Sequence, residues 1–356
     1  MPAVSHPRWL RRLLTPTAWF YAQFMRIRAA LYARGTLRPR RLPARVISVG
    51  NLTVGGTGKT PLVLWLAQRL QGAGLRVAIL SRGYGRSVRQ ARIFANGIPR
   101  VEEAGDEPVL LARRLHGVPL GIAADRFAVG LQLAARHRPD VFLLDDGFQH
   151  LRLARDLDIV LLDASDPFGG GYVLPAGALR EPVDALVRAQ VVVLTRSRQA
   201  ADSAIEAVRL YNPRVPVFRA RTRLAGVLDA TSHKPVPRET LAGVPVLAFC
   251  GIGNPAAFWQ DVRDWGFRLA GTQAFPDHHR YSADDFRRIA RQADRYAAQA
   301  LLTTEKDVVN FTVFPPSIPP CYYCRMELEF EDEEGFWGTV VAGLKLPVAP
   351  EARYVQ

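Results

Sequence analysis

Short runs of apolar, largely β-branched residues recur along the first part of the chain and alternate with stretches whose apolar residues have helical spacing. The helical stretches lie near residues 59–72, 106–116 and 125–137. The apolar runs comprise residues 46–49, 76–80, 141–145, 158–163 and 191–195. Continuous apolar strands that alternate with helices are typical of a parallel sheet covered by helices on both faces, so the pattern predicts an α/β fold.

The alternation breaks over residues 196–245, where arginine and proline are frequent. A second, smaller α/β unit follows, with apolar strands at 246–250 and 300–304 and a helix that starts near Pro255. A chain of 356 residues is long enough for two domains. We therefore predict an N-terminal helix over residues 1–35, a larger α/β domain over 36–220 and a smaller α/β domain over 221–356.

The N-terminal segment combines aromatic residues with arginines. Its uncharged stretch, residues 13–25, is too short to span a bilayer, and no small-residue cleavage site follows it. Thr15-Pro16 fits a helix start, which predicts a helix from about 17 to 34. We interpret this helix as one that lies in the headgroup plane of a membrane. The alternative is an ordinary amphipathic helix packed on the domain.

The strand at residues 46–49 leads into a glycine-rich turn and a Gly-Lys-Thr helix start. Backbone amides of such a turn, the helix N-terminus and the lysine together hold phosphates, and the hydroxyl of Thr60 can bind Mg²⁺. The alternative is a turn that binds no nucleotide. We predict a P-loop NTPase-like fold that binds a nucleoside triphosphate through Thr53, Val54, Gly55, Gly56, Thr57, Gly58, Lys59 and Thr60.

This loop departs from two known patterns. Thr53 stands where the plain G-x-x-x-x-G-K-[ST] pattern has its first glycine, and Val54 stands where partitioning and metal-chaperone ATPases have a signature lysine. Among 47 basic residues only Lys59, Lys234, Lys306 and Lys345 are lysines. A compact ammonium has therefore been kept at the position that faces phosphates.

The net charge of +14 and the pI near 10.3 imply an anionic partner. Nucleic acid, an anionic membrane surface and a phosphorylated substrate all qualify, and charge alone cannot choose among them. The odd number of cysteines argues against a disulfide framework and for a reducing compartment. Cys321 and Cys324 have metal-site spacing, but they lie in an expected strand without a second pair, which favours a structural role.

Several acidic and histidine residues could carry chemistry. Asp145 ends the apolar strand at 141–145, where a Mg²⁺-binding aspartate sits in such folds; the alternative is that it only terminates the strand. Asp106 precedes a helix and fits either an N-cap or a catalytic carboxylate. His278 and His279 are adjacent, and a histidine beside a carboxylate could orient a general base. The pair Arg180-Glu181 fits a surface ion pair equally well.

In combination and in order, these motifs resemble the tetraacyldisaccharide 4′-kinase family of lipid A biosynthesis over nearly the whole chain. The motifs are residues 50–61, 81–85, 105–108, 125–126, 145–150, 174–177, 179–182, 275–278 and 304–307. Each motif is weak alone, but the ordered set is specific. The resemblance implies that ATP phosphorylates the 4′-hydroxyl of a tetraacylated glucosamine disaccharide 1-phosphate at the cytoplasmic face of a Gram-negative inner membrane.

The resemblance also implies roles for single residues. Asp106 is expected to be the general base, with His278 orienting or tuning it. Lys59 and the loop amides are expected to hold the β- and γ-phosphates, and Thr60 and Asp145 to hold Mg²⁺. The remaining expected site residues are Asp146, Gln149, Arg180 and Glu181 at the reacting centre and Arg126 at an anionic part of the lipid or nucleotide.

Two other functions compete. A partitioning or metal-chaperone switch would carry its signature lysine at Val54 or a guanine-reading Asn-Lys-x-Asp, and neither motif is present. A nucleic-acid-binding ATPase would explain the charge, but no recognition module is visible. We therefore expect a peripheral, monomeric kinase that binds ATP, Mg²⁺, an acylated disaccharide 1-phosphate and the inner-membrane surface, and no nucleic acid.

Overall fold

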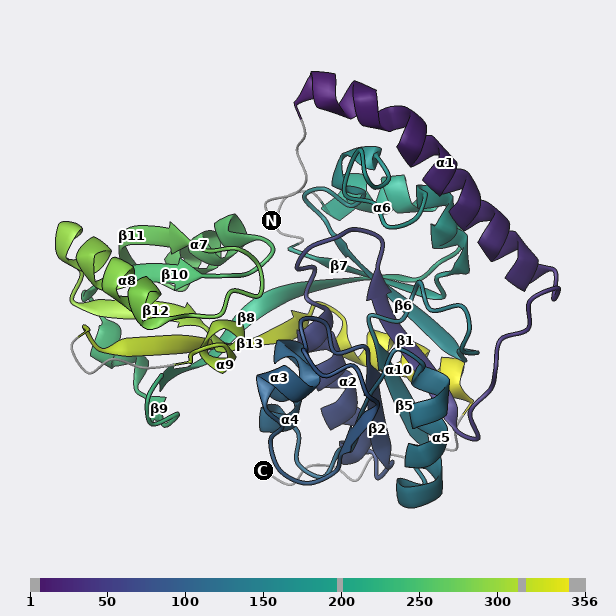
Figure 1. Ribbon diagram of the computed structural model, residues 1–356, viewed down its shortest axis with the longest axis horizontal. Helices are drawn as coiled ribbons and strands as arrows, with labels where there is room; N and C mark the ends of the chain where they lie inside the picture. The colour runs from purple at the N-terminus through teal and green to yellow at the C-terminus, as the bar shows by residue number, and fades with distance from the viewer. Residues whose placement is uncertain (1–6, 197–200, 313–317, 346–356) are drawn as a thin grey trace.

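The computed structural model describes residues 7–196, 201–312 and 318–345. Within them the strands form one sheet shared by two lobes, a larger lobe on the right of Figure 1 and a smaller lobe on the left. The strand order is β11-β10-β12-β13-β8-β7-β6-β1-β5-β2-β4-β3, and β9 pairs with β8. The predicted α/β class is confirmed, and the two predicted sheets are continuous.

The larger lobe is built on a parallel sheet, with β3 antiparallel at its edge. Its strands are β1 (Arg45–Asn51), β2 (Val77–Ser81), β3 (Arg92–Phe94), β4 (Leu120–Ile122), β5 (Val141–Asp145), β6 (Leu157–Asp163) and β7 (Val191–Thr195). Five of them are the apolar runs of the sequence. These strands read as continuous apolar runs because helices bury both faces of the sheet.

Helices cover the two faces of this sheet. One face carries α2 (Lys59–Gly72), α4 (Asp106–Arg114) and α10 (Glu333–Leu344), and the other carries α5 (Arg126–His137) and α6 (Ala201–Arg209). Shorter helical segments are α3 (Val101–Ala104), η1 (Gly169–Gly171) and η2 (Val183–Arg188). Alternate residues of β1 serve the two cores: Ile47 and Val49 pack under α2, and Val46 packs under α5.

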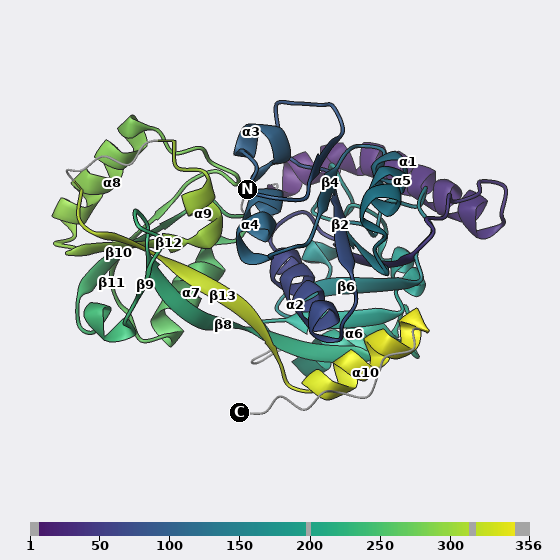
Figure 2. The same cartoon turned by 90° about the horizontal axis from the view of Figure 1, so that it is seen from below.

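Two long antiparallel strands, β8 (Val217–Asp229) and β13 (Cys321–Phe330), bridge the lobes, as Figure 2 shows. Arg221 pairs with Glu329 at 2.8 Å and Arg223 with Glu327 at 2.9 Å, directly across the ladder. Strand β8 lies in the segment where the alternation of predicted strands and helices breaks. The predicted domain boundary at residue 220 therefore falls inside a strand. Helix α10 then returns to the larger lobe and buries Phe336 against Trp65.

The smaller lobe extends the sheet with three parallel strands. They are β10 (Pro245–Cys250), β11 (Arg268–Ala274) and β12 (Ala300–Thr304), and the remaining elements are β9 (Pro235–Val236), η3 (Arg238–Leu241), α7 (Pro255–Asp264), α8 (Ala283–Arg295) and α9 (Glu305–Val309). Helix α7 packs on one face through Phe258 and Val262, and α8 packs on the other through Phe286 and Ile289. The lobe therefore has its own core on each side of the sheet.

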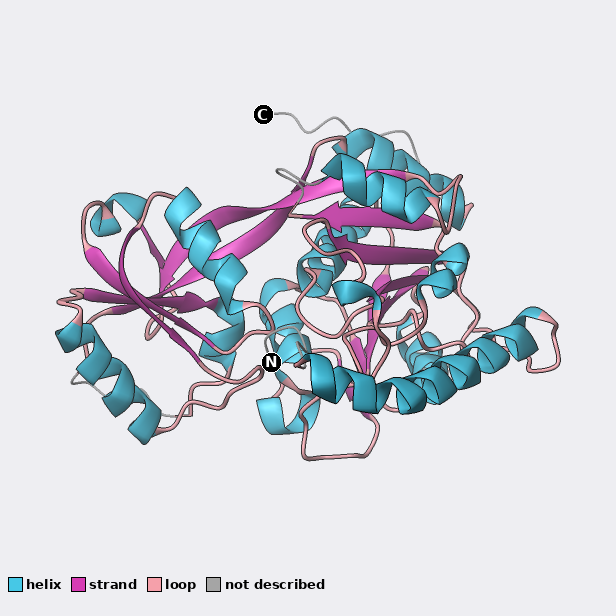
Figure 3. Ribbon diagram, turned by 90° about the horizontal axis from the view of Figure 1, so that it is seen from above, coloured by secondary structure: helices cyan, strands magenta, loops and turns pink. Residues whose placement is uncertain are grey.

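Helix α1 (Arg8–Ala33) lies along the outside of the larger lobe (Figure 3). The expected start at Thr15-Pro16 was wrong, because the helix begins at Arg8 and continues through Pro16. A proline inside a helix removes one backbone donor but does not always end the helix. The Thr15 hydroxyl donates to the Arg11 carbonyl at 2.8 Å in this turn. None of the described helices combines the length and the apolar character needed to cross a membrane.

Candidate active site

The carboxyl ends of strands from both lobes face the interface between the lobes, where Asp106 contacts His278 and Gly253 approaches the phosphate loop. In the larger lobe β1 leads into the phosphate loop and β5 ends at Asp145. In the smaller lobe β10 leads into the turn at 251–254, β11 leads toward His278, and β12 leads into α9. Open α/β sheets bind ligands outside the carboxyl ends of their strands, so the fold brings the expected site residues to the expected edge.

The phosphate loop has the backbone that its glycines permit. Gly55 and Gly58 have φ angles of 118° and 88°, a region that residues with a Cβ rarely adopt, and α2 begins at Lys59 directly after Gly58. The Val54 amide donates to the Ala178 carbonyl at 2.8 Å. The Thr57 hydroxyl is buried without a hydrogen-bond partner among the described residues. The loop is therefore anchored at one end and ready to accept an anion at the helix N-terminus.

Asp146 joins two cations of the expected site. It lies 3.5 Å from Lys59 Nζ and accepts hydrogen bonds of 2.8 and 2.6 Å from Arg180 Nη1. Burial alone would raise its pKa, but Lys59 and Arg180 outweigh burial and hold the pKa of Asp146 at about 2. The carboxylate thus stays ionised and fixes Lys59 and Arg180 beside the phosphate loop.

Asp145 has the surroundings of a metal ligand. The side chain is buried, its Oδ2 accepts a hydrogen bond of 3.2 Å from Ser81 Oγ, and its Oδ1 has no partner in the described part of the chain. Burial, followed by the charges of Glu107 and Asp146, raises the pKa of Asp145 to about 7. A buried carboxylate with a free oxygen and anionic neighbours fits a divalent cation, and Mg²⁺ typically uses one or two carboxylates plus phosphate oxygens.

Asp106 and His278 form a pair across the lobes. His278 Nδ1 lies 2.7 Å from Asp106 Oδ2, and Asp106 Oδ1 accepts the Glu107 amide at 2.9 Å. The N-cap of α4 is Gly105, and α4 has no side-chain cap, so the helix-cap interpretation of Asp106 was wrong. His278 has a left-handed backbone with φ of 60°, a strained conformation that often marks functional sites.

The surroundings of this pair favour its ionised form. Burial alone would raise the pKa of Asp106, but the hydrogen bond of His278 and the charge of Lys306 outweigh it and lower that pKa. Burial alone would lower the pKa of His278, and the hydrogen bond to Asp106 outweighs it and raises that pKa. His279 points elsewhere, with its ring stacked on Phe275 and its Nε2 3.1 Å from Asp285.

Known proteins resemble this chain along most of its length. The family model for tetraacyldisaccharide-1-P 4′-kinase matches residues 10–345. The tetraacyldisaccharide 4′-kinase of Pelobacter propionicus is 44% identical over 307 residues, which cover 85% of this chain and 84% of that protein. The enzyme of the same name from Geobacter metallireducens is 43% identical over 316 residues, which cover 88% and 92%.

The chain belongs to the tetraacyldisaccharide 4′-kinase family. A crystal structure of LpxK from Aquifex aeolicus in complex with ATP is 32% identical, superposes with a TM-score of 0.75, and is matched over 94% of this chain and 99% of that chain. The P-loop fold expected from the sequence agrees with this likeness.

The other expected site residues of this family member have partners within the chain. Gln149 Nε2 donates to the Asn51 carbonyl at the end of β1, at 3.0 Å. Arg126 is buried and donates to the Ala124 carbonyl at 3.2 Å. Glu181 accepts a hydrogen bond of 2.6 Å from Arg188 Nη2. Gln149 therefore lies at the phosphate loop, while Glu181 already has a cationic partner.

Sequence reasoning gave no role to Ser81, Gly253 and Lys306. Ser81 ends an apolar run as Asp145 does, so its position at the sheet edge carried a signal. Lys306 lies in the family motif at 304–307, but no local pattern says which carboxylates it meets. No sequence pattern marks Gly253 as important, because the residues that it approaches, Gly55 and Gly56, belong to the other lobe.

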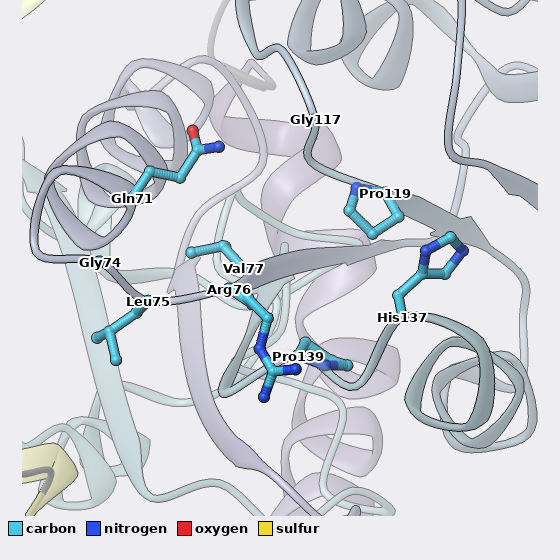
Figure 4. Close-up of a pocket in the computed structure, with 9 residues that line it drawn as sticks. All are labelled: Gln71, Gly74, Leu75, Arg76, Val77, Gly117, Pro119, His137 and Pro139. Atoms are coloured by element: carbon cyan, nitrogen blue, oxygen red, sulfur yellow. The ribbon is translucent and has the colours of Figure 1, made fainter.

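A cavity of about 300 Å³ lies elsewhere in this kinase family member (Figure 4). It opens where β2 begins, at the edge of the sheet opposite the phosphate loop. Its lining residues are Gln71, Gly74, Leu75, Arg76, Val77, Gly117, Pro119, His137 and Pro139. None of the expected site residues lines it; they lie instead at the phosphate loop and at the interface between the lobes.

Gly253 is where the smaller lobe touches the phosphate loop. A Cβ at Gly253 would lie 2.8 Å from the Gly56 nitrogen and 3.1 Å from the Gly55 Cα. The φ angle of Gly253 is outside the left-handed region, so alanine suits the turn itself and is excluded only by the neighbouring backbone. The glycine thus permits the close approach of the two lobes.

We predict that Gly253→Ala lowers kcat/KM for ATP by about tenfold to a hundredfold, because it displaces the smaller lobe from the phosphate loop. The melting temperature should stay close to that of the wild type. Gly338→Ala is the matched control, since a Cβ there meets no atom within 4 Å. Steady-state kinetics check this, and wild-type kcat/KM in Gly253→Ala would contradict it.

Proposed function

We propose that this chain transfers the γ-phosphate of ATP to the 4′-hydroxyl of a tetraacylated disaccharide 1-phosphate at a membrane surface, with Asp106 and His278 as the base. Family membership supports the reaction. The observation that carries the assignment of residues is the 2.7 Å contact between His278 and Asp106 across the two lobes. Glu107, the neighbour of Asp106, lies close enough to Asp145 to raise its pKa.

The residues that bind the phosphates belong to the larger lobe. Lys59 and the amides of the loop neutralise and hold the β- and γ-phosphates, and Arg180 adds a second cation close by. Thr60 and Asp145 are the residues that would hold Mg²⁺, which when bound would supply positive charge next to the phosphates. Positioning and charge neutralisation are most of what phosphoryl transfer requires from a protein.

The proton of the acceptor hydroxyl goes to the pair at the lobe interface. Asp106 Oδ2 is ionised and accepts that proton, and His278 Nδ1 holds the carboxylate oxygen in place. The pair requires both lobes, because Asp106 comes from α4 and His278 from the loop after β11. Closure of the lobes therefore completes the site at the moment when both substrates are held.

Helix α1 supports binding to a membrane. Its inner face is made of Ala18, Ala22 and Met25, which pack on the protein. Its outer face presents large apolar side chains at helical spacing, each 60–70% exposed. These are Trp9, Leu13, Phe20, Phe24 and Ile27. An exposed row of large apolar side chains, beside an inner face that buries two alanines and one methionine, fits a helix that lies in the headgroup plane.

The same helix touches the site. The Tyr21 hydroxyl donates to the Arg180 carbonyl at 3.1 Å, and Arg28 Nη2 donates to the Gln149 carbonyl at 3.1 Å. A substrate with several acyl chains stays in the bilayer, so the enzyme must come to it. We place the chain peripherally at the cytoplasmic face of the inner membrane, as a monomer, with its positive charge toward anionic lipid.

Lys59→Ala and Asp145→Ala should each lower kcat by at least about a hundredfold, because each removes charge neutralisation from the transferred phosphoryl group. The assay is transfer of labelled γ-phosphate from ATP to a tetraacyl disaccharide 1-phosphate in detergent micelles. Lys234→Ala, at an exposed lysine, is the control. If either variant melts normally and has a kcat near that of the wild type, the phosphoryl-transfer assignment is contradicted.

Asp106→Asn and His278→Ala should remain folded at the assay temperature and lose about 10²–10⁴ in kcat, because a general base is lost or misplaced. Asparagine retains an acceptor for the Glu107 amide but cannot take up the hydroxyl proton. The double variant should be little worse than Asp106→Asn alone, since the two residues act as one unit. Full activity of Asp106→Asn would show that this carboxylate is not the base.

Replacing Phe20 and Phe24 together by serine should lower the affinity for anionic liposomes by about tenfold or more, as measured by co-sedimentation. The reason is that two aromatic rings would no longer insert into the membrane. ATP binding should persist. The control is Leu131→Ser, which removes an exposed leucine from α5, away from α1. If the double variant sediments with liposomes as well as the wild type does, α1 is not the membrane contact.

A further inference from the structure

Helix α9 is held rigidly at the lobe interface. Asp307 is buried and accepts hydrogen bonds from the Gly251 amide at 2.7 Å and the Tyr281 hydroxyl at 2.8 Å. Glu305 accepts a hydrogen bond of 3.0 Å from Arg114, whose side chain is also buried. These contacts fix the residues on either side of Lys306, so the position of its side chain is determined by the fold.

The Lys306 ammonium meets carboxylates from both lobes. Its Nζ lies 3.5 Å from Glu107 Oε1 and 3.9 Å from Asp106 Oδ2, both in α4 of the larger lobe. It also lies 3.5 Å from Asp277 Oδ1 in the smaller lobe. Lys306 is thus within reach of the carboxylate that we assign as the base and of the residue next to His278.

We propose that Lys306 is a positioning residue, which holds Asp106 and His278 in register across the lobes and through its charge favours the ionised carboxylate. This inference rests on the proposed role of Asp106 as the base. Lys306 acts on the reaction through that pair, and no contact with a substrate is required of it.

The charges around the pair explain why a cation is needed there. Asp106, Glu107 and Asp277 are three carboxylates in one cluster, in which Asp106 is buried and the other two are partly exposed, and they are opposed by Lys306 and His278. Asp307 lies on the same helix as Lys306, and the centroid of the Tyr84 ring lies 5.1 Å from that of the His278 ring. Without the ammonium, the carboxylates would repel one another and the lobes would meet less closely.

The direction of the pH effect follows from these charges. A cation close to a carboxylate lowers its pKa by about 1–3 units, so removing Lys306 should raise the pKa of Asp106. The same charge opposes protonation of His278, so the pKa of His278 should rise as well. Both members of the pair then take up protons at higher pH. Because the base must be deprotonated, the acidic limb of the activity profile should move to higher pH.

A lysine suits this position better than an arginine. An ammonium is a compact charge that can face three carboxylates at once, whereas a guanidinium prefers a planar, bidentate contact with one of them. Only four of the 47 basic residues are lysines, and two of those four, Lys59 and Lys306, lie at the candidate site.

The test compares profiles of kcat/KM from about pH 3.5 to 9, a range that includes the acidic limb of a carboxylate base, for Lys306→Met, Lys306→Arg and the exposed control Lys234→Met. Lys306→Met should move the acidic limb upward by about one unit or more and regain much of its activity at high pH. In Lys306→Arg the acidic limb of the pH profile should lie at the same pH as in the wild type, even if kcat is lower. A uniform loss in Lys306→Met, with the limb unmoved, would overturn the proposal.

Asp277→Asn gives an independent test that does not depend on how Lys306→Met folds. Removing an anion from the cluster should move the acidic limb to lower pH, opposite to Lys306→Met. Titration of His278 by NMR in both variants measures the same shifts without turnover. If neither variant shifts the acidic limb of the pH profile or the titration of His278, the proposal for Lys306 is refuted and the base assignment is unaffected. Full activity of Asp106→Asn would refute the base assignment.

Discussion

The hydrogen bond between His278 and Asp106 connects the two lobes at the candidate site, next to the continuous sheet, the Gly253 turn and ion pairs such as Arg114–Glu305. Each partner is unfavourable alone, because burial opposes the charged form of both side chains. Together they neutralise one another, and Lys306 offsets the excess of carboxylates around them. The pair is therefore electrostatically complete only where the lobes meet, so the proposed base depends on contact between them.

The bridge of β8 and β13 determines how the lobes can meet. Exposed ion pairs such as Arg221–Glu329 contribute little to stability, so their alternation along the ladder mainly favours the observed register. Because both strands run through both lobes, bending of this ladder would move the smaller lobe as a unit. The return of α10 to the larger lobe means that no single cut in the sequence separates the two bodies.

Much of the larger lobe could be predicted from the sequence because its strands are buried on both faces and therefore consist of continuous apolar runs. Strand β8 was missed because Arg219, Arg221 and Arg223 suggested a break, although arginines at every second position also fit a strand with one exposed face. The candidate site is a different case. Asp106 and His278 lie far apart in the sequence, so only the family resemblance paired them before the structure was known.

Helix α1 links the proposed membrane surface to the chemistry through short contacts. Tyr21 binds the backbone of Arg180, the Arg180 side chain binds Asp146, and Asp146 lies 3.5 Å from Lys59. A headgroup hydroxyl can rise only a short way above the bilayer while its acyl chains stay inserted, so its phosphate donor must be held close to the membrane plane. A helix braced on the loops at the carboxyl edge of the sheet meets that requirement. A helix at the opposite edge, where the cavity of Figure 4 opens, would place the phosphate loop on the far side of the sheet from the lipid.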